Sequence, residues 1–140
     1  MGYYSQVAYA VVFWNERDRD KVLDTLTPEQ QKLVRVEADV FANDRVYFHE
    51  PSAKWYSTRL VHDGFTDVDA HEAFLKAAED AHDEWSLSGG QDGVQSMGVF
   101  MRMGEEDDDF ERNVWGEGIA GFPDWFELVD SRRELTIGWE

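Results

Sequence analysis

The four histidines, His49, His62, His71 and His82, are the side chains best suited to bind a transition metal. Their spacing matches no compact metal site, such as two histidines four residues apart on one helix. His71 and His82 fall in one expected helix, where a separation of eleven residues places them about 16 Å apart. The chain has no cysteine, which excludes a thiolate zinc site and a thiol nucleophile. We therefore expect no metal and no cofactor.

No pattern typical of catalysis is present elsewhere in the chain. The sequence has no Gly-x-Ser-x-Gly nucleophile motif and no glycine-rich loop that ends in Lys-Ser or Lys-Thr. Gly104 precedes the acidic run 105–111 instead of interrupting it, unlike the glycine of a calcium-binding loop. The 30 acidic residues guarantee chance carboxylate pairs, so no pair indicates acid–base chemistry on a sugar. We expect no catalytic residues and no enzyme activity.

The acidic surplus says more about partners than about chemistry. Against 30 acidic residues stand 13 basic ones, a formal net charge of -17 on 140 residues. Such a charge repels nucleic acid and attracts basic protein surfaces. A helix places carboxylates three or four residues apart at roughly 5–6 Å, comparable to successive phosphates of a strand, so an acidic helix face can imitate DNA. The expected contact surface comprises Glu72, Glu79, Asp80 and Asp83 of one helix, and the block Glu105, Glu106, Asp107, Asp108, Asp109 and Glu111.

Two other interpretations of the acids stay open. Most amphipathic helices have a charged outer face, so the helix acids can be a solvated surface without a partner. Only four of the 13 basic residues are lysines and the acids are spread along the whole chain, a profile shared by proteins adapted to high salt.

Six tryptophans give a further indication of an interface. Trp115 and Trp125 lie near glycine-rich segments, where an exposed aromatic side chain can anchor a protein partner. We include Trp115 in the expected contact surface, with core packing as the alternative for each tryptophan.

The first third of the chain predicts a buried strand followed by two helices. Residues 7–13 are apolar on both faces, which is typical of a central strand. Asn15 can cap a helix from Glu16 to about Leu26. Thr27, Pro28 and Gln30 form a capping box for a second helix, expected to be short because residues 34–40 alternate with a period of two. A helical continuation to residue 41 is the alternative.

The rest of the chain predicts a mixture of strands and one long helix. Asn43-Asp44 can form a turn into a strand over 45–50, which Pro51-Ser52 ends before a short extended segment at 54–56. The period changes to that of a helix from residue 66 or 67 to residue 85. Residues 97–103 then alternate as a strand, and the apolar runs 125–129 and 135–139 predict a terminal hairpin.

These elements predict one α+β domain over residues 1–140, with two main helices packed on one face of a mostly antiparallel sheet. The start of the chain lacks the basic segment of a signal peptide, and the apolar stretch 7–14 is too short to cross a bilayer. We expect an intracellular protein that does not contact membranes.

Four short segments resemble a group of small acidic proteins encoded by tailed bacteriophages and prophages. They are the start Gly2-Tyr3-Tyr4-Ser5-x-Val7-Ala8, the central Lys54-Trp55-Tyr56, the Phe65-x-Asp67-Val68 before the long helix, and Gly104-Glu105-Glu106-Asp107. The resemblance implies a viral origin, the α+β layout and the cytoplasm of a host cell, and it supplies no catalytic residues.

Charge and resemblance together favour a DNA-mimic-like inhibitor that binds the positively charged DNA-binding surface of a host defence or DNA-processing enzyme. It would not bind nucleic acid directly. An immunity-type protein that neutralises a basic nuclease toxin is the alternative from another class, beside salt adaptation alone.

Overall fold

The elements follow in chain order as β1 (Ser5–Phe13), α1 (Glu16–Leu23), α2 (Pro28–Glu37), β2 (Val40–Ala42), β3 (Arg45–Ala53), α3 (Asp67–Leu87), β4 (Ser96–Met103), β5 (Phe110–Trp115), β6 (Val129–Asp130) and β7 (Thr136–Ile137). The computed structural model describes residues 5–53, 67–104, 110–119, 121–123, 129–130 and 136–137. Five strands form one antiparallel sheet, and β6 pairs with β7. The expected α+β class is confirmed.

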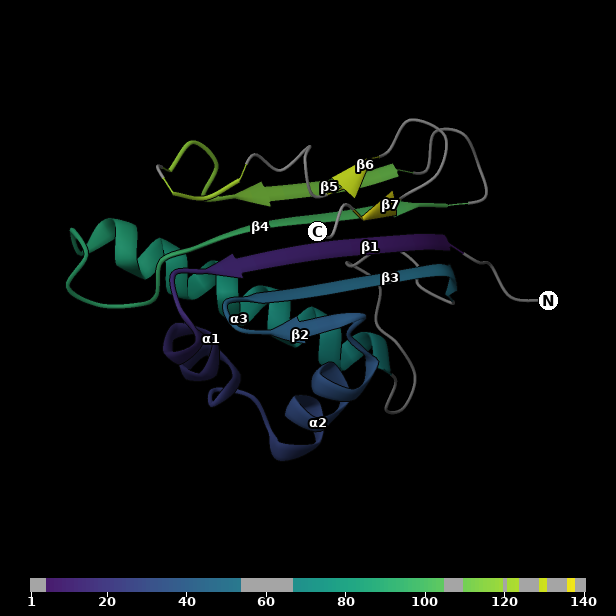
Figure 1. Ribbon diagram of the computed structural model, residues 1–140, viewed down its shortest axis with the longest axis horizontal. Coiled ribbons are helices and arrows are strands. Elements are labelled where there is room, and N and C mark those ends of the chain that lie inside the picture. The colour runs from purple at the N-terminus through teal and green to yellow at the C-terminus, as the bar shows by residue number, and fades with distance from the viewer. Residues whose placement is uncertain are drawn as a thin grey trace.

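β1 is the central strand of the sheet, whose order is β2-β3-β1-β4-β5 (Figure 1). Because β3 is antiparallel to both β1 and β2, the strands β1 and β2 run in the same direction with β3 between them. By the same argument β3 and β4 are parallel, with β1 between them. Parallel strands need a crossover connection, and here α1 with α2 supplies one and α3 supplies the other.

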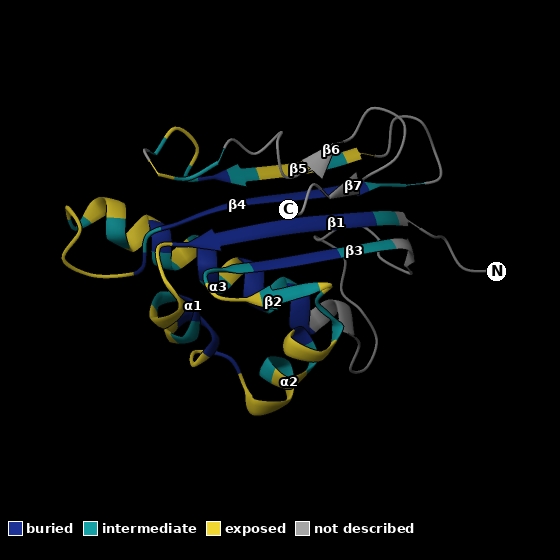
Figure 2. Cartoon of the chain, in the orientation of Figure 1, coloured by how far each residue is buried: buried dark blue, intermediate teal, exposed yellow. Residues whose placement is uncertain are grey.

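The central strands β1 and β4 are buried on both faces, as the apolar run of β1 predicts, whereas the edge strands β2 and β5 are partly exposed (Figure 2). Val7, Tyr9, Val11 and Phe13 belong to the core that includes the apolar side chains of all three helices. Ala8, Ala10 and Val12 belong to a second core on the opposite face, with Met97, Val99 and Met101 of β4. The terminal strands β6 and β7 contact β1, and Figure 1 shows them over the sheet on the side away from α1 and α2. The expected terminal hairpin is confirmed in the antiparallel pairing of 129–130 with 136–137, and the rest of the predicted runs lies outside the described residues.

The local signals at the helix ends act as predicted. The Asn15 side chain accepts the Asp18 backbone N–H at 2.8 Å and caps α1. Thr27 and Gln30 form the full capping box of α2, with Pro28 in the first turn. Asn43 adopts a φ of 54° in the turn between β2 and β3, a conformation that asparagine tolerates better than most residues.

The prediction of a short second helix followed by an alternating strand is wrong. α2 continues to Glu37, with Val34 fully buried and Val36 72% exposed. Over only four residues, a strand with a period of two and a single helical turn give similar patterns of apolar residues. Here the capping box at the start of α2 favoured the helix. The alternative of a longer helix was correct, although the helix does not reach residue 41, since β2 already begins at Val40.

Two other boundaries also differ from the prediction. α1 ends at Leu23, although Leu26 still packs in the core at 9% exposure. Pro51 does not end β3, which continues to Ala53. The pairing with β1 shifts between Val7 opposite Glu50 and Ser5 opposite Ala53, and such an irregularity is where a strand tolerates a proline.

The long helix and the strand after it are confirmed as α3 and β4. Strand β5 was not predicted, because residues 110 and 111 were assigned to the acidic block and Trp115 was interpreted by the glycine-rich segment beside it. The predicted segment 54–56 lies outside the described residues. Among the helices of the described part, none is both long and apolar enough to cross a membrane.

Candidate functional site

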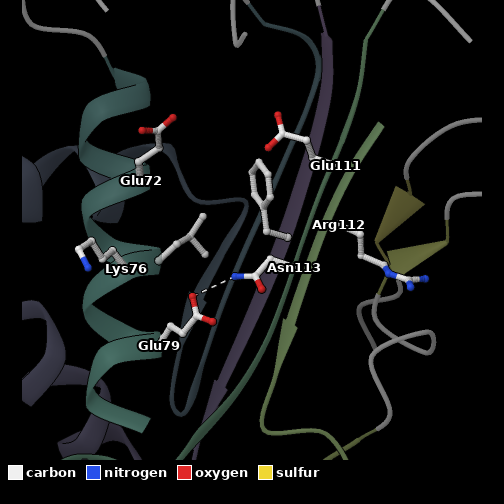
Figure 3. A pocket seen from close by; sticks show the side chains of 8 residues that line it. Glu72, Lys76, Glu79, Glu111, Arg112 and Asn113 are labelled. Atoms are coloured by element: carbon white, nitrogen blue, oxygen red, sulfur yellow. Dashed lines mark hydrogen bonds between the residues drawn. The ribbon is translucent and has the colours of Figure 1, made fainter. Parts of the chain in front are cut away.

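A groove of about 280 Å³ lies between α3 and the edge strand β5 (Figure 3). Its lining combines carboxylates, an aromatic ring and one side-chain amide, which come from α3, β4 and β5. The lining residues are Glu72, Leu75, Lys76, Glu79, Phe100, Glu111, Arg112 and Asn113.

Helical spacing gathers the acids of α3 on one side of the helix. Glu72, Glu79 and Asp83 are separated by seven and four residues, and seven is close to two full turns. Ala70, Phe74 and Ala78 are fully buried on the side that packs on the sheet. The acids therefore follow the flank of α3 beside β5, with Leu75, 8% exposed, at the base of the groove.

The alternation of β5 supplies the opposite wall. Asn113 pairs with Phe100 and Glu111 with Arg102 across the β4–β5 ladder. Phe100 belongs to the core on the helix side of the sheet, so side chains at 111 and 113 face α3. Arg112 alternates to the other face and points away from the groove in Figure 3.

Two side-chain contacts fix Glu79 and Glu111 of the groove. The Asn113 amide donates from Nδ2 to Oε1 of Glu79 at 3.0 Å and joins the two walls. The Arg102 guanidinium donates from Nε to Oε1 of Glu111 at 2.7 Å. The Arg102 side chain is 2% exposed, so this ion pair lies at the edge of the core and holds Glu111 in place.

The two basic residues of the lining do not direct their charges into the groove. Lys76 Nζ donates to Asp80 Oδ2 at 2.9 Å on the solvent side of α3. This hydrogen bond raises the pKa of Lys76, and the charge of Asp80 adds to the effect. Figure 3 shows both Lys76 and Arg112 turned outward from the space between the walls.

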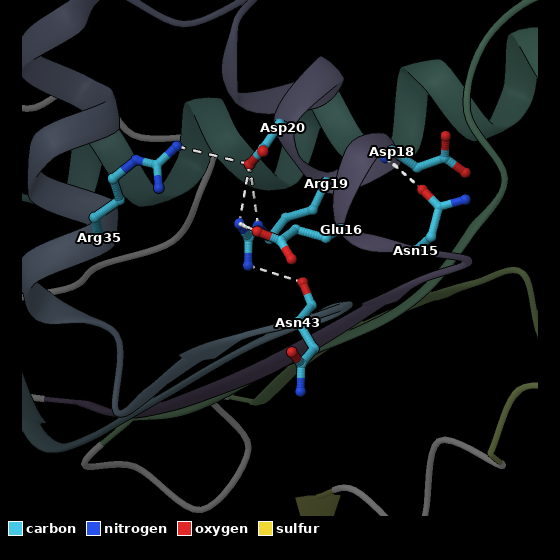
Figure 4. A network of polar contacts seen from close by, with 7 residues as sticks. All are labelled: Asn15, Glu16, Asp18, Arg19, Asp20, Arg35 and Asn43. Carbon is cyan, nitrogen blue, oxygen red and sulfur yellow. Dashed lines mark hydrogen bonds and ion pairs between the residues drawn. The ribbon is translucent and has the colours of Figure 1, made fainter.

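The acids near the other helices are engaged by arginines instead (Figure 4). The Arg19 side chain, 6% exposed, contacts Asp20 at 3.0 Å and Glu16 at 3.4 Å. Its Nη1 donates to the Asn43 carbonyl at 2.8 Å, and Arg35 approaches Asp20 at 3.7 Å. This network joins α1, α2 and the β2–β3 turn. The acids of α1 thus compensate arginines of this chain, as Glu111 beside the groove does for Arg102. Glu79, in contrast, accepts from the neutral Asn113 amide.

The structure brings together part of the predicted contact surface. Glu72, Glu79 and Glu111 line one groove, although they come from two segments far apart in the sequence. Asp80 and Asp83 are exposed on the same helix. Glu105, Glu106, Asp107, Asp108 and Asp109 lie outside the described residues, between the paired positions Met103 and Phe110.

The expectation of an exposed anchor at Trp115 is corrected, because this side chain is buried at 5% exposure. Its Nε1 donates to Ser96 Oγ at 3.0 Å, and its ring fills the space above Gly98 on β4. Trp115 ends a strand and does not lie in a loop, so core packing was the correct alternative. Trp125 lies outside the described residues.

Sequence reasoning missed Phe100 and Asn113 as groove residues, Arg102 as the partner of Glu111, and Trp14 as an exposed aromatic. Trp14 is 56% exposed and packs edge-on against Phe122, with ring centroids 5.7 Å apart. The alternation from 110 to 115 was the signal that could have identified β5 and its groove-facing residues. Nothing in the order of residues distinguishes Trp14, which directly follows a buried strand, from a core tryptophan.

The histidines that the structure describes on α3 point into the protein. His71 is 1% exposed and His82 8% exposed. Within the described residues, no three histidine, aspartate or glutamate side chains are grouped so that they could hold a metal ion.

In comparisons with known proteins, no family model, no curated protein and no solved structure matches the chain.

Proposed function

We propose that this chain is a DNA-mimic-like inhibitor of phage type, which binds the positively charged DNA-binding surface of a host defence or DNA-processing enzyme. The observation that carries the proposal is the acidic flank of α3, defined as Glu72, Glu79 and Asp83, with Glu111 across the groove. A separation of eleven residues gives this flank a length of about 16 Å. Carboxylates in such a row offer a basic channel the charge pattern of a short stretch of DNA backbone.

The contrast between the two acidic regions supports this placement. Around α1, the carboxylates of Glu16 and Asp20 lie within 3.4 Å of an arginine of the same chain. Beside the groove, the cations of Lys76 and Arg112 are directed outward. Among the described residues neither Glu79 nor Asp83 forms an ion pair, so a basic partner gains most at these two acids of the flank.

The net charge of -17 acts on the approach of the partner as well as on the contact. A strongly negative protein is steered toward a basic surface over distances of about a Debye length, roughly 10 Å at 0.1 M salt. Inhibition should therefore be fast at low salt and should weaken as salt rises.

Displacement of DNA from purified enzymes tests the proposal. A fluorescein-labelled duplex is bound to a restriction enzyme, a CRISPR effector complex, a recombination nuclease or a topoisomerase, and anisotropy is followed as the acidic protein is added. We expect displacement from at least one of these enzymes, with the apparent inhibition constant rising about tenfold between about 50 and 200 mM salt. Failure to displace DNA from any of them would contradict the proposal and would favour salt adaptation as the origin of the charge.

A matched pair of variants locates the contact. Glu79→Gln with Asp83→Asn removes two charges from the flank, whereas Asp24→Asn with Glu117→Gln removes two exposed charges elsewhere. The first pair should weaken inhibition about tenfold, on the scale of one or two charge-assisted contacts, and the second less than about twofold. Equal weakening by both pairs would show that total charge acts and that the flank of α3 is not the contact.

A further inference from the structure

We propose that β5 is a docking edge, at which an extended basic segment of the partner adds a further strand to the five-stranded sheet. The inference rests on the proposed function for the basic character of the partner and adds the way in which the two proteins join. β5 is an edge strand, because among the described residues it pairs with β4 alone (Figure 1). β6 overlaps β5 in this view, but β6 pairs with β7 in a separate sheet.

The opposite edge of the sheet is blocked by several local features. The short strand β2 covers β3 only over residues 45–47. Beyond it, the His49 backbone N–H donates to Oδ2 of Asp39 at 2.6 Å, and Pro51 has no N–H to offer. The register of β3 with β1 also shifts between Ser5 and Val7. Short edge strands, prolines and irregular registers are the usual devices that keep another strand from pairing with an edge.

β5 has none of these features. The strand has six residues, Phe110–Trp115, without a proline or a lysine. Its register with β4 is continuous from Met103 opposite Phe110 to Gly98 opposite Trp115. In an antiparallel ladder, every second residue of an edge strand directs its backbone N–H and C=O away from the sheet. Asn113 is exposed and Phe110 is 43% exposed, so the strand is accessible to a partner.

The charges around β5 favour a basic segment as the occupant. Acids at residues 105–109 directly precede the strand in the sequence. On the side of α3, Asn113 donates to Glu79 at 3.0 Å, and Asp83 is exposed about one helical turn further on. An added strand would lie about 4.8 Å beyond β5, with every second side chain on the side of α3. Arginine or lysine at these positions can reach back toward Glu79 and Asp83, neither of which forms an ion pair among the described residues.

The same charges oppose a second copy of this chain as the occupant. Antiparallel pairing of β5 with its own copy is a two-fold contact, in which a residue on the axis lies opposite itself. With the axis at Glu111 or at Arg112, like charges would lie directly opposite each other, which is destabilising. Each copy also has a net charge of -17 and repels the other. The edge therefore favours a strand of opposite charge over its own copy.

A capped peptide of sequence Thr-Arg-Val-Arg-Val-Thr is the probe, because its arginines fall on one face of a strand. Titrated into the ¹⁵N-labelled protein at low salt, it should shift the NMR signals of the amides of residues 110–115 in one saturable process. It should also slow hydrogen exchange of the outward amides of β5 at least about tenfold, because these amides become bonded. Shifts spread evenly over the acidic residues, without protection of β5, would overturn the proposal.

Two isomers of this peptide separate strand addition from attraction of charge. One isomer has N-methyl groups on the arginine amides, and the other has them on the valine amides. Successive residues of a strand direct their amides to opposite edges, so only one of these sets can bond to β5. One isomer should therefore bind about tenfold more weakly than the other, on the scale of one or two lost hydrogen bonds. Equal affinities would overturn the proposal, since the isomers have the same charge and composition.

A lysine on the edge tests the same contact from the side of this protein. Asn113→Lys keeps a donor for Glu79 and places on β5 the cation with which many sheets protect their edges. It should weaken binding of the unmethylated peptide about tenfold. Gln91→Lys makes the same change of charge at an exposed position after α3 and should weaken binding less than about twofold. Equal losses in the two variants would also overturn the assignment to β5.

Sedimentation equilibrium tests the alternative occupant. The wild-type protein should be monomeric at low and at high salt. A dimer that Asn113→Lys dissociates would assign the edge to a second copy of the chain and would overturn the proposal.

The peptide titrations and the DNA-displacement assay separate failure of this inference from failure of the proposed function. DNA displacement without a difference between the methylated isomers would refute strand addition and leave the inhibitor function standing. A difference between the isomers without displacement of DNA from any enzyme would refute the inhibitor function and leave β5 as a docking edge for basic strands.

Discussion

The Tyr9 hydroxyl donates to Nδ1 of His71 at 2.6 Å, a contact that joins the central strand β1 to α3 across 62 positions of sequence. Nε2 of the same imidazole lies 2.8 Å from Oε1 of Glu37 at the end of α2. A carboxylate can only accept, so Nε2 carries a proton, and when the ring is neutral Nδ1 is the acceptor for Tyr9. The hydroxyl and the imidazole are both buried, at 0% and 1% exposure of their residues.

Replacing Tyr9 by phenylalanine should therefore destabilise the protein. The variant leaves a polar atom of His71 in the core without the donor that Tyr9 supplies, between aromatic rings such as Phe48, whose centroid lies 4.2 Å from the imidazole. Such a loss costs about 1–3 kcal/mol of unfolding free energy. Urea denaturation followed by tryptophan fluorescence measures it.

Tyr47→Phe is the matched control for the loss of a buried hydroxyl. The Tyr47 oxygen accepts from Arg45 at 3.1 Å, and this half-exposed arginine keeps its contact with Asp44. Removal of the Tyr47 hydroxyl should lower the unfolding free energy by less than removal of the Tyr9 hydroxyl does. A Tyr9→Phe variant as stable as the Tyr47→Phe variant would show that the bond to His71 contributes little.

Alkaline pH should also destabilise the protein through Tyr9. Burial raises the pKa of Tyr9 well above its ordinary value, and the charges of Glu37 and Asp39 raise it further. Above about pH 10 the unfolded chain loses this proton while the folded chain keeps it, so the unfolding free energy must fall as pH rises. Denaturation curves between about pH 8 and 11 should show a shallower decline for Tyr9→Phe. Tyr47, whose pKa is also raised by burial, accounts for part of the remaining slope.

The sequence predicted the elements whose signals are local. The caps at Asn15 and Thr27 and the two apolar faces of β1 each depend on a few adjacent residues, and the structure confirms them. The end of α2 and the course of β3 past Pro51 were mispredicted because both depend on pairing with distant strands. Strand β5 was missed for a similar reason, since its alternation is weakened by charged residues on both faces.

The candidate site could be predicted only in part. Helical spacing alone places Glu72 and Glu79 on one flank. The meeting of this flank with Glu111 depends on the packing of α3 beside β5, which no local pattern encodes. Trp115 is buried because Gly98 lies opposite it in the ladder, a relationship that only the register reveals.

A side chain at position 98 should be incompatible with Trp115. A Cβ added to Gly98 would fall on the indole ring, which is itself fixed by its bond to Ser96. We expect Gly98→Ala to destabilise the protein by about 1–3 kcal/mol or more through overpacking. Thermal and urea unfolding measure the loss.

A double-mutant cycle identifies the cause of that loss. Trp115→Phe removes the part of the ring that the new methyl group would meet, so Gly98→Ala should cost less in that background. Additive losses in the double variant would place the cause in the backbone of β4 and not in the contact with Trp115.

Mildly acidic pH should destabilise the protein through His82. Burial lowers the pKa of His82 although Asp83 and Glu79 oppose the shift, and Nδ1 accepts the Ser96 backbone N–H at 3.3 Å. As pH falls below about 6.5, the unfolded chain gains this proton before the folded chain does, so unfolding free energy is lost. The loss of unfolding free energy between about pH 7 and 5 should be smaller for His82→Gln than for the wild type. Parallel curves would show that His82 does not contribute to the pH dependence.

Charge reversal of the block between β4 and β5 tests the second part of the predicted contact surface. Replacement of Glu105, Glu106, Asp107, Asp108 and Asp109 by lysine should abolish the displacement of DNA from the target enzyme. The fold should persist, because the flanking residues Met103 and Phe110 pair within the ladder and the block itself lies between the two strands. Circular dichroism and a melting curve check the fold beside the anisotropy assay.

The matched control reverses five exposed acids elsewhere, namely Asp24, Glu29, Glu84, Asp92 and Glu117. Because both variants have the same net charge, a loss confined to the first assigns the contact to the block, whereas unchanged inhibition excludes the block and leaves the flank of α3 as the contact surface.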